Sequence, residues 1–235
     1  MEYVYKDPPL PSLKRLRKLY RNNPKDSVLR VLEYETLAEK PLSGRVLDVG
    51  GGRKARYLKH LPDGLQVESV NIDPQIEPTW LIEPGAPFPM VDDSFDYVIC
   101  LNTLEHIYDA RGVVDEILRV LKPGGTAYVS VPFMFRIHAH PDDFFRGTSS
   151  WWKETFRRAG FSRLELQPLI WGRKTAAGLI GGYRGLMPAS MNKLIAHLFD
   201  WAYAKLLIGR EGNYSSARGQ RICAVASGYF MAARK

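Results

Sequence analysis

The sequence is poor in cysteine, with only Cys100 and Cys223 among its 235 residues. Both lie inside apolar runs and not at the spacings of disulfide frameworks or zinc ligands, so we expect small buried side chains in a reducing compartment. The opening stretch MEYVYKDPPLP has neither the charged leader nor the apolar core of a signal peptide. These absences exclude a disulfide scaffold and predict a cytoplasmic protein.

Long apolar runs, low-complexity segments and internal repeats are also missing. The longest uncharged apolar run, ICAVASGYFMAA, is too short to span a bilayer and is typical of a buried strand. An apolar content of 45% is enough for one sizeable core. We therefore expect one principal domain.

The net charge of +8 is concentrated near the start of the chain. Residues 1–60 hold 14 Lys and Arg against 7 Asp and Glu (+7), whereas residues 61–235 hold 19 against 18 (+1). The stretch SLKRLRKLYRN spaces leucines at helical intervals and fills the other face with basic residues. Residues 1–43 should thus form a basic helical segment. It either contacts an anionic membrane or another acidic partner, or packs on the main domain with a solvated charged face.

Beyond residue 43, apolar segments alternate with helical ones. The expected strands are Arg45–Gly50, Gln66–Asp73, Thr79–Ile82, Phe95–Leu101, Gly125–Pro132, residues 161–169 and the closing stretch ICAVASGYFMAARK. The expected helices include VLRVLEYETLAEK, Lys54–Leu61, Ala110–Leu121 and SSWWKETFRRAG. This order predicts a three-layer, doubly wound α/β fold with a mostly parallel sheet, in which ligands bind at the carboxyl ends of the strands.

Residues 170–219 interrupt this alternation before the last strand. They contain a glycine-rich stretch, GLIGGYRG, and an amphipathic helix candidate, MNKLIAHLFDWAYAKLLIG. Its apolar stripe predicts a lid over the site, a membrane-facing surface or a helix packed on the core.

A glycine-rich turn follows the first strand of this alternation. Asp48 precedes Gly50, Gly51 and Gly52, where the backbone can approach a ligand closely. Asp73 ends the next strand about twenty residues later, where a carboxylate can accept ribose hydroxyls or serve as an ordinary turn residue. The spacing alone also permits a dinucleotide such as NAD.

The following segments separate these possibilities. The chain contains Pro87-Phe88, Ser94-Phe95-Asp96, Leu104-Glu105-His106, RVLKPGG at residues 119–125 and Val131-Pro132, in that order. Together with Asp48-Val49-Gly50, this pattern closely resembles class I S-adenosylmethionine-dependent methyltransferases of the type 11 group. The resemblance covers residues 44–165 and implies a Rossmann-like, seven-stranded fold with S-adenosylmethionine as cofactor.

The resemblance also implies residue roles. The methionine and ribose parts of the cofactor would be contacted by Asp48, Gly50, Gly51 and Gly52, and the methionine part also by Asn102. The ribose hydroxyls would be bound by Asp73. The adenine would lie between Ile72 and Pro74, with its amino group near Glu83. In this family Glu105 and His106 are mostly structural or near the cofactor.

Acceptor contacts are expected in PFMFRIHAHPDDFFRGT, residues 132–148. This stretch resembles methyltransferases associated with cell-surface glycan modification. His138 or His140 could act as a general base oriented by Asp143, or these groups could simply fix the loop. A metal site built on the spacing H-x-H-x-D lacks the further histidines that such sites need, so no metal is expected.

The sequence therefore predicts a class I methyltransferase domain over residues 44–235. It would transfer methyl groups to a small-molecule or glycan-type acceptor, as in polysaccharide biosynthesis. A lipid-linked acceptor is one form of this prediction. A non-catalytic cofactor-binding scaffold and a nucleic-acid methyltransferase are the alternatives. The latter is disfavoured because no RNA-binding module is present. The oligomeric state is not predicted.

Overall fold

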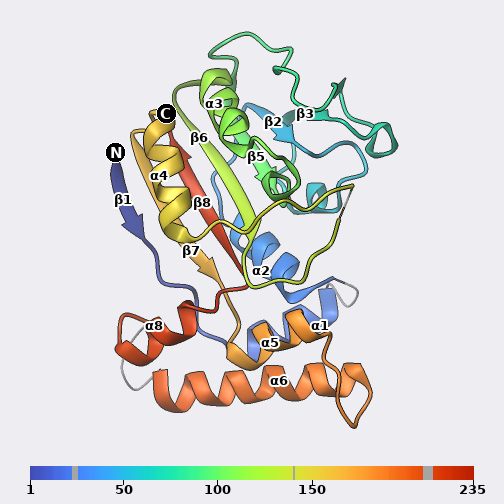
Figure 1. The fold of residues 1–235 in the computed structure, drawn as a ribbon, viewed down its shortest axis with the longest axis vertical. Coiled ribbons are helices and arrows are strands. Elements are labelled where there is room, and N and C mark those ends of the chain that lie inside the picture. The colour runs from blue at the N-terminus through green and yellow to red at the C-terminus, as the bar shows by residue number, and fades with distance from the viewer. Residues whose placement is uncertain (23–25, 140, 209–213) are drawn as a thin grey trace.

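A computed structural model describes residues 1–22, 26–139, 141–208 and 214–235. Its centre is an eight-stranded sheet in the order β1-β7-β8-β6-β5-β2-β3-β4 (Figure 1). The strands are β1 (Glu2–Tyr5), β2 (Arg45–Val49), β3 (Gln66–Asn71), β4 (Trp80–Leu81), β5 (Phe95–Leu101), β6 (Leu121–Pro132), β7 (Arg163–Leu169) and β8 (Gly228–Arg234). Only β8 runs antiparallel to its neighbours, β6 and β7. The expected fold class is confirmed, with one strand more than the seven predicted.

Helices flank the sheet, and further helices form the lower end of the molecule (Figure 1). They are α1 (Leu13–Asn22), α2 (Val28–Leu37), α3 (Ala110–Val120), α4 (Ser149–Ala159), α5 (Arg173–Gly181), α6 (Ala189–Tyr203) and α8 (Ala217–Cys223). A π-helical turn, Ala204–Ile208, continues α6. None of the helices within the described ranges has both the length and the hydropathy needed to cross a bilayer.

Alternate residues of the central strands enter two separate cores. Val98 of β5 and Val129 of β6 pack with α3 and α4 on one face, whereas the adjacent Ile99 and Tyr128 pack with α1 and α2 on the other. This division follows from the two-residue period of a strand. The sheet is thus buried on both sides, as a parallel sheet requires.

The extra strand comes from the basic N-terminal segment. Glu2 of β1 pairs with Arg163 of β7, and Lys6 N donates to Leu166 O at 2.9 Å. Downstream, α1 buries Leu16 and Leu19 against the second core. The basic helix therefore packs on the domain, with Lys14, Arg17 and Lys18 exposed on its outer side.

Several expected elements differ from the structure, among them the strand expected over Gly125–Pro132, which begins at Leu121. Lys54–Leu61 forms only a 3₁₀ helix, Arg56–His60, because Ala55 and Leu61 are both extended and Pro62 follows. The closing strand starts at Gly228, not at the beginning of ICAVASGYFMAARK. Ile222 and Cys223 instead end α8, where they are buried in a third, smaller core.

Residues 170–208 and 214–219 lie beyond the carboxyl end of β7, at the lower end of the molecule (Figure 1). They are held there by Asp200 of α6, whose carboxylate accepts the N–H groups of Lys174 and Thr175 at the start of α5. Tyr20 of α1 also contacts α6, through His197 Nδ1 at 2.9 Å. This end is therefore built jointly by the N-terminal helix and the segment before the last strand.

Candidate active site

The glycine turn begins where β2 ends. Gly50 has φ of +84°, and a Cβ atom there would overlap the Thr103 side chain. Asn71, the last residue of β3, donates from Nδ2 to the carbonyls of Gly50 at 2.8 Å and Gly51 at 3.2 Å. The turn is therefore fixed by the neighbouring strand, a contact that the sequence pattern did not indicate.

The other two glycines are required by packing within the chain. A side chain at Gly51 would meet Asp48, and one at Gly52 would meet the Ile76 carbonyl. Tyr57 donates its hydroxyl to Asp48 Oδ1. Burial raises the pKa of Asp48 to about 7, although the hydrogen bond from Tyr57 acts in the opposite direction.

Asp73 lies at the carboxyl end of β3, half-buried. Its Oδ1 caps a short 3₁₀ helix by accepting Gln75 N at 2.9 Å, which leaves Oδ2 for a ligand. Ile72 and Pro74 beside it are exposed, so their side chains are accessible to an adenine ring. Glu83 is also exposed and lies in the loop after β4.

Asn102 follows β5 and has φ of +49°, which is rare for a residue other than glycine. Its Nδ2 donates to Glu33 Oε2 of α2, and Ser130 Oγ of β6 reaches the same oxygen at 3.2 Å. Glu33 is fully buried, and burial raises its pKa to about 7. Helix α2 therefore contributes to the edge of the sheet where ligands are expected.

This edge fits the cofactor that the motifs imply. Asp48 Oδ2, Glu33 Oε1 and Asn102 Oδ1 are buried acceptors without a hydrogen-bond partner in the described part of the chain. Buried polar atoms are normally satisfied, and the ammonium and hydroxyl groups of S-adenosylmethionine are donors of the required kind.

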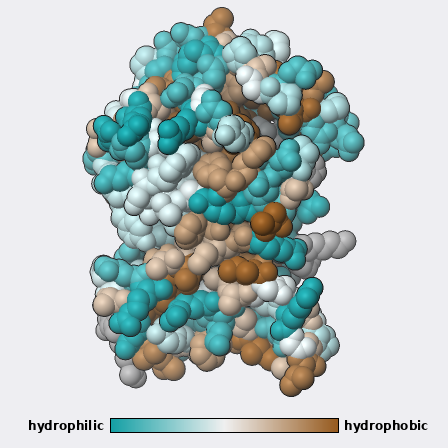
Figure 2. Space-filling model, in the orientation of Figure 1, coloured by the Kyte–Doolittle hydropathy of each residue, from teal (hydrophilic) through white to brown (hydrophobic). Residues whose placement is uncertain are grey.

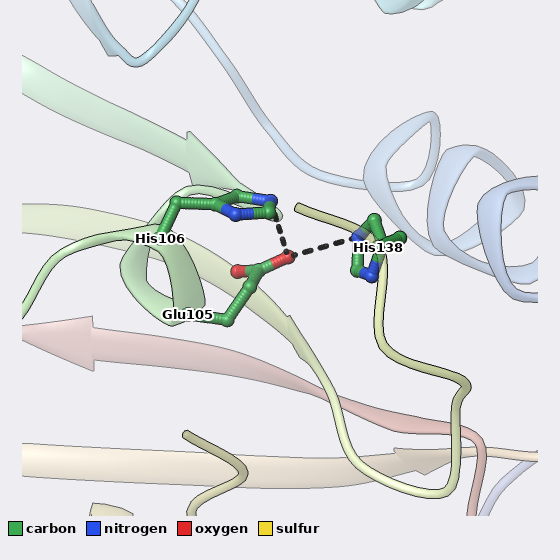
Figure 3. Close-up of side chains that lie close together, drawn as sticks. All are labelled: Glu105, His106 and His138. Carbon is green, nitrogen blue, oxygen red and sulfur yellow. Dashed lines mark ion pairs between the residues drawn. The ribbon is translucent and has the colours of Figure 1, made fainter. Parts of the chain in front are cut away.

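A second cluster joins Glu105 and His106, after β5, to His138, after β6 (Figure 3). Glu105 Oε1 lies 3.6 Å from His106 Nε2 and 3.8 Å from His138 Nε2. Burial raises the pKa of Glu105 to about 8, and burial lowers the pKa of His138. The sequence had placed His138 near the reaction but not Glu105 or His106.

Asp143 holds the loop that carries His138. It accepts His138 N at 2.9 Å through Oδ2, and both of its oxygens accept from the Arg146 guanidinium. These bonds hold the pKa of Asp143 at about 2, so it remains a carboxylate that orients its neighbours. His140 lies outside the described residues.

An open pocket lies on the chain segments that follow Glu105-His106 and His138. Phe144 N donates to Glu105 O at 2.8 Å, and the Phe144 ring meets Tyr108 edge to face at 5.7 Å. The pocket is lined by Tyr108, Asp109, Ala110, Arg111, Phe144, Phe145 and Trp151. Aromatic faces with one cation and one carboxylate are suited to a small ring-containing ligand.

The comparisons with known proteins agree with this geometry. A family described as methyltransferase domain matches residues 16–166, more than half of the chain. The chain belongs to this methyltransferase family. Membership confirms the methyltransferase domain and S-adenosylmethionine as its cofactor, both expected from the sequence.

Curated relatives of this methyltransferase domain include a ubiquinone biosynthesis O-methyltransferase of Xanthomonas axonopodis pv. citri. The alignment of 115 residues is 31% identical, and it covers 42% of this chain and 47% of the relative. The chain thus aligns with about half the length of such relatives.

Solved structures show the same fold. A SAM-dependent methyltransferase from Archaeoglobus fulgidus has a TM-score of 0.55 at 15% identity, covering 95% of this chain and 100% of that one. Phosphoethanolamine N-methyltransferase 2 of Haemonchus contortus, solved with S-adenosylhomocysteine, has a TM-score of 0.54 at 18% identity, covering 87% and 52%.

Proposed function

We propose that the protein transfers the methyl group of S-adenosylmethionine to a hydroxyl oxygen of a small, ring-containing acceptor. The observation that carries this proposal is the aromatic pocket beside Glu105, His106 and His138. A ring stacked on Tyr108 or Phe144 would have its substituents next to the one cluster of imidazole and carboxylate groups at this part of the sheet edge.

When bound, the cofactor supplies a methyl group on a positively charged sulfur. The acceptor oxygen forms a bond to the methyl carbon while the carbon–sulfur bond breaks, and the bonding pair stays on sulfur. The hydroxyl proton leaves at the Glu105–His106–His138 cluster. The chain itself therefore positions the cofactor and the acceptor, and it assists the loss of the hydroxyl proton.

The glycine turn and Asp73 would hold the cofactor on one side of this reaction. Asn102 follows β5, which lies between β6 and β2 in the sheet. Asn102 and Glu33, to which it is bonded, would face the methionine part of the cofactor. His138, with Asp143 and Arg146 behind it, belongs to the acceptor side.

The finer proposal is a lipid-linked acceptor. The outer side of α6 exposes Met191, Ile195, Leu198 and Phe199, and Figure 2 shows hydrophobic side chains along this lower end of the molecule. The relative named for ubiquinone biosynthesis supports an acceptor ring on a lipid tail. The motif in residues 132–148 supports a glycan on a lipid carrier.

The first experiment is calorimetric titration with S-adenosylmethionine, S-adenosylhomocysteine and NAD. We expect micromolar binding of the two sulfur nucleotides, no binding of NAD, and at least tenfold weaker binding by Asp73→Ala, which is about 1.4 kcal/mol. Circular dichroism verifies that the variant is folded. Absence of binding of both sulfur nucleotides by the wild type would contradict the enzyme and the cofactor-binding scaffold alike.

The acceptor is tested with methyl-labelled cofactor and two panels, polyprenyl phenols and lipid-linked sugars. Label should enter one panel, and Phe144→Ala should raise KM for that acceptor with little change in cofactor affinity. Val91→Ala, exposed in a distant loop, is the control. Labelling of neither panel, or of nucleic acid instead, would contradict the proposal.

A further inference from the structure

The three side chains of the second cluster have the arrangement of a metal centre. Their ligand atoms all lie within 4.8 Å of one another, and Glu105 Oε1 is 3.6 Å and 3.8 Å from the two Nε2 atoms. At metal–ligand distances of about 2.1 Å, tetrahedral ligands lie about 3.4 Å apart. A small inward adjustment of these side chains would therefore suffice to bind an ion.

The carboxylate at the centre of this cluster lacks partners. Glu105 is 1% exposed, and neither of its oxygens has a hydrogen bond from another residue in the described ranges. Figure 3 shows one of these oxygens directed at both imidazoles. A buried carboxylate in this position requires a cation or a proton between it and the rings.

The far nitrogens of both imidazoles face acceptors. His106 Nδ1 contacts the Asp142 carbonyl. His138 Nδ1 lies 3.3 Å from the Arg136 carbonyl and 3.4 Å from Asp143 Oδ2. An Nδ1 that donates to a carbonyl or carboxylate leaves Nε2 unprotonated, which is the arrangement found behind metal-bound histidines.

The surrounding charges do not replace a cation at this point. Arg146 Nη2 is 3.4 Å from His138 Nδ1, but its guanidinium is engaged by Asp143. Arg30 of α2 interacts with Glu33 and Tyr34 and more weakly with Glu105, to which it donates no hydrogen bond. The acceptors of Glu105, His106 and His138 therefore converge on one point that no arginine fills.

We propose that Glu105, His106 and His138 bind a divalent transition-metal ion, of the class represented by Zn²⁺, Co²⁺ and Mn²⁺. Two imidazoles and one carboxylate favour such ions over Mg²⁺ or Ca²⁺, which take mostly oxygen ligands. This site differs from the H-x-H-x-D spacing rejected from sequence, because two of its ligands follow β5. It replaces the expectation that the protein has no metal.

The role of the ion rests on the proposed function. Three protein ligands leave a coordination position open, and the aromatic pocket is joined to the ligand-bearing loop by the bond from Phe144 N to Glu105 O. An acceptor hydroxyl bound there would have its pKa lowered by the ion, so its proton could leave to solvent without a free imidazole base. His106 and His138 would then act as ligands and not as bases.

The test is titration of metal-free, full-length protein with ZnCl₂ and CoCl₂, without cofactor or acceptor. We expect one ion per chain and, with Co²⁺, visible d–d absorption of a four- or five-coordinate centre. Glu105→Gln and His138→Ala should each weaken binding at least tenfold. Asp142→Asn, which changes an exposed neighbouring carboxylate but keeps the backbone carbonyl that His106 contacts, should bind as the wild type does.

The outcomes separate this site from the methyltransferase proposal. Failure of the wild type to bind either ion, or equal affinity in Glu105→Gln and His138→Ala, would overturn the metal site, and methyl transfer that persists with a chelator would then identify a proton as the partner of Glu105. Specific binding of Co²⁺ without any acceptor methylated would support the site and count against the acceptor proposal alone. His138→Ala keeps the test valid if Glu105→Gln does not fold.

Discussion

Three carboxyl groups, on Asp48, Glu33 and Glu105, are buried at the edge of the sheet where the parallel strands end. Desolvation is the largest effect on each, and it raises the pKa of each above the ordinary range. Buried carboxyl groups with a raised pKa lower the stability of a fold near neutral pH, and they occur typically where ligands bind. Asp48 offers the clearest measurement, because Tyr57 is the one side chain that donates a hydrogen bond to it in the described part of the chain.

Asp48→Asn should change how stability depends on pH. The folded pKa of Asp48, about 7, exceeds the unfolded value of about 3.9, so the fold is favoured below pH 4 and loses stability as pH rises to 7. The variant does not titrate and can still accept the Tyr57 hydroxyl. Its free energy of unfolding, minus that of the wild type, should increase by a few kcal/mol from pH 4.5 to pH 8 in urea titrations. An equal difference at both pH values would contradict this.

Asn102 tests a backbone requirement together with a hydrogen bond. Asn102→Gly keeps the positive φ but removes the donor to Glu33, which should cost about 1–3 kcal/mol. Asn102→Ala loses the same bond and adds about 1 kcal/mol of left-handed strain. Urea unfolding of both variants should rank alanine below glycine, and the reverse order would show that φ at this position relaxes.

At the scale of elements, α1 is attached through Arg15. Its guanidinium donates to Glu35 of α2 and to the carbonyls of Pro9 and Leu10, and it lies 5.3 Å from the Trp171 ring centre. The basic character of α1 is therefore partly structural.

Arg15→Gln should consequently lower the free energy of unfolding by about 1–3 kcal/mol, since it removes charge-assisted hydrogen bonds. Arg17→Gln, on the exposed side of the same helix, should change it by less than about 0.5 kcal/mol. The measurement is chemical denaturation at low and moderate salt. Equal effects of the two substitutions would mean that α1 is held by its leucines alone.

The elements also show what sequence patterns can and cannot predict. Phe95–Leu101 was placed with its observed bounds because continuous apolar residues end at a turn. Helix α4 was expected as SSWWKETFRRAG, and the structure shows that Thr148 caps it and Gly160 ends it. Strand β1 was missed because four residues at a sheet edge carry no periodicity of their own, and their pairing partner lies far away in the sequence.

The site was predicted unevenly for a similar reason. Asp48, Gly50 and Asp73 follow motifs that lie within single turns, so sequence could place them. The Glu33–Asn102 bond and the cluster of Glu105 with His138 join separate elements, and no local pattern encodes such a contact. The Glu105-His106 pair was visible in the sequence but was interpreted as structural or near the cofactor, and the third member of the cluster lies after β6.

At the scale of the whole molecule, the lower end combines the apolar side of α6 with the basic side of α1. If a lipid-linked acceptor is reached from a membrane, vesicles of phosphatidylglycerol should sediment the protein and phosphatidylcholine vesicles should do so less. The double variant Ile195→Asp, Phe199→Asp should reduce binding at least tenfold, because burying one such side chain contributes about 1.5–3 kcal/mol.

Val91→Asp, exposed elsewhere, is the matched control for an added charge. Loss of binding in both variants would indicate a charge effect unrelated to α6. Unchanged binding in the α6 variant would remove this face from the proposal, while salt sensitivity alone would point to α1.

The pairing of β1 with β7 determines when the start of the chain can fold. Glu2 meets Arg163, so β1 has no pairing partner until most of the protein has been synthesised, whereas α1 can already pack on α2 through Arg15 and Glu35. At about 5–20 residues per second, β1 remains unpaired for roughly ten seconds or longer on the ribosome, and α1 lacks its Tyr20 contact with His197 for a similar time. Final closure of the sheet edge is therefore a late, high-contact-order step.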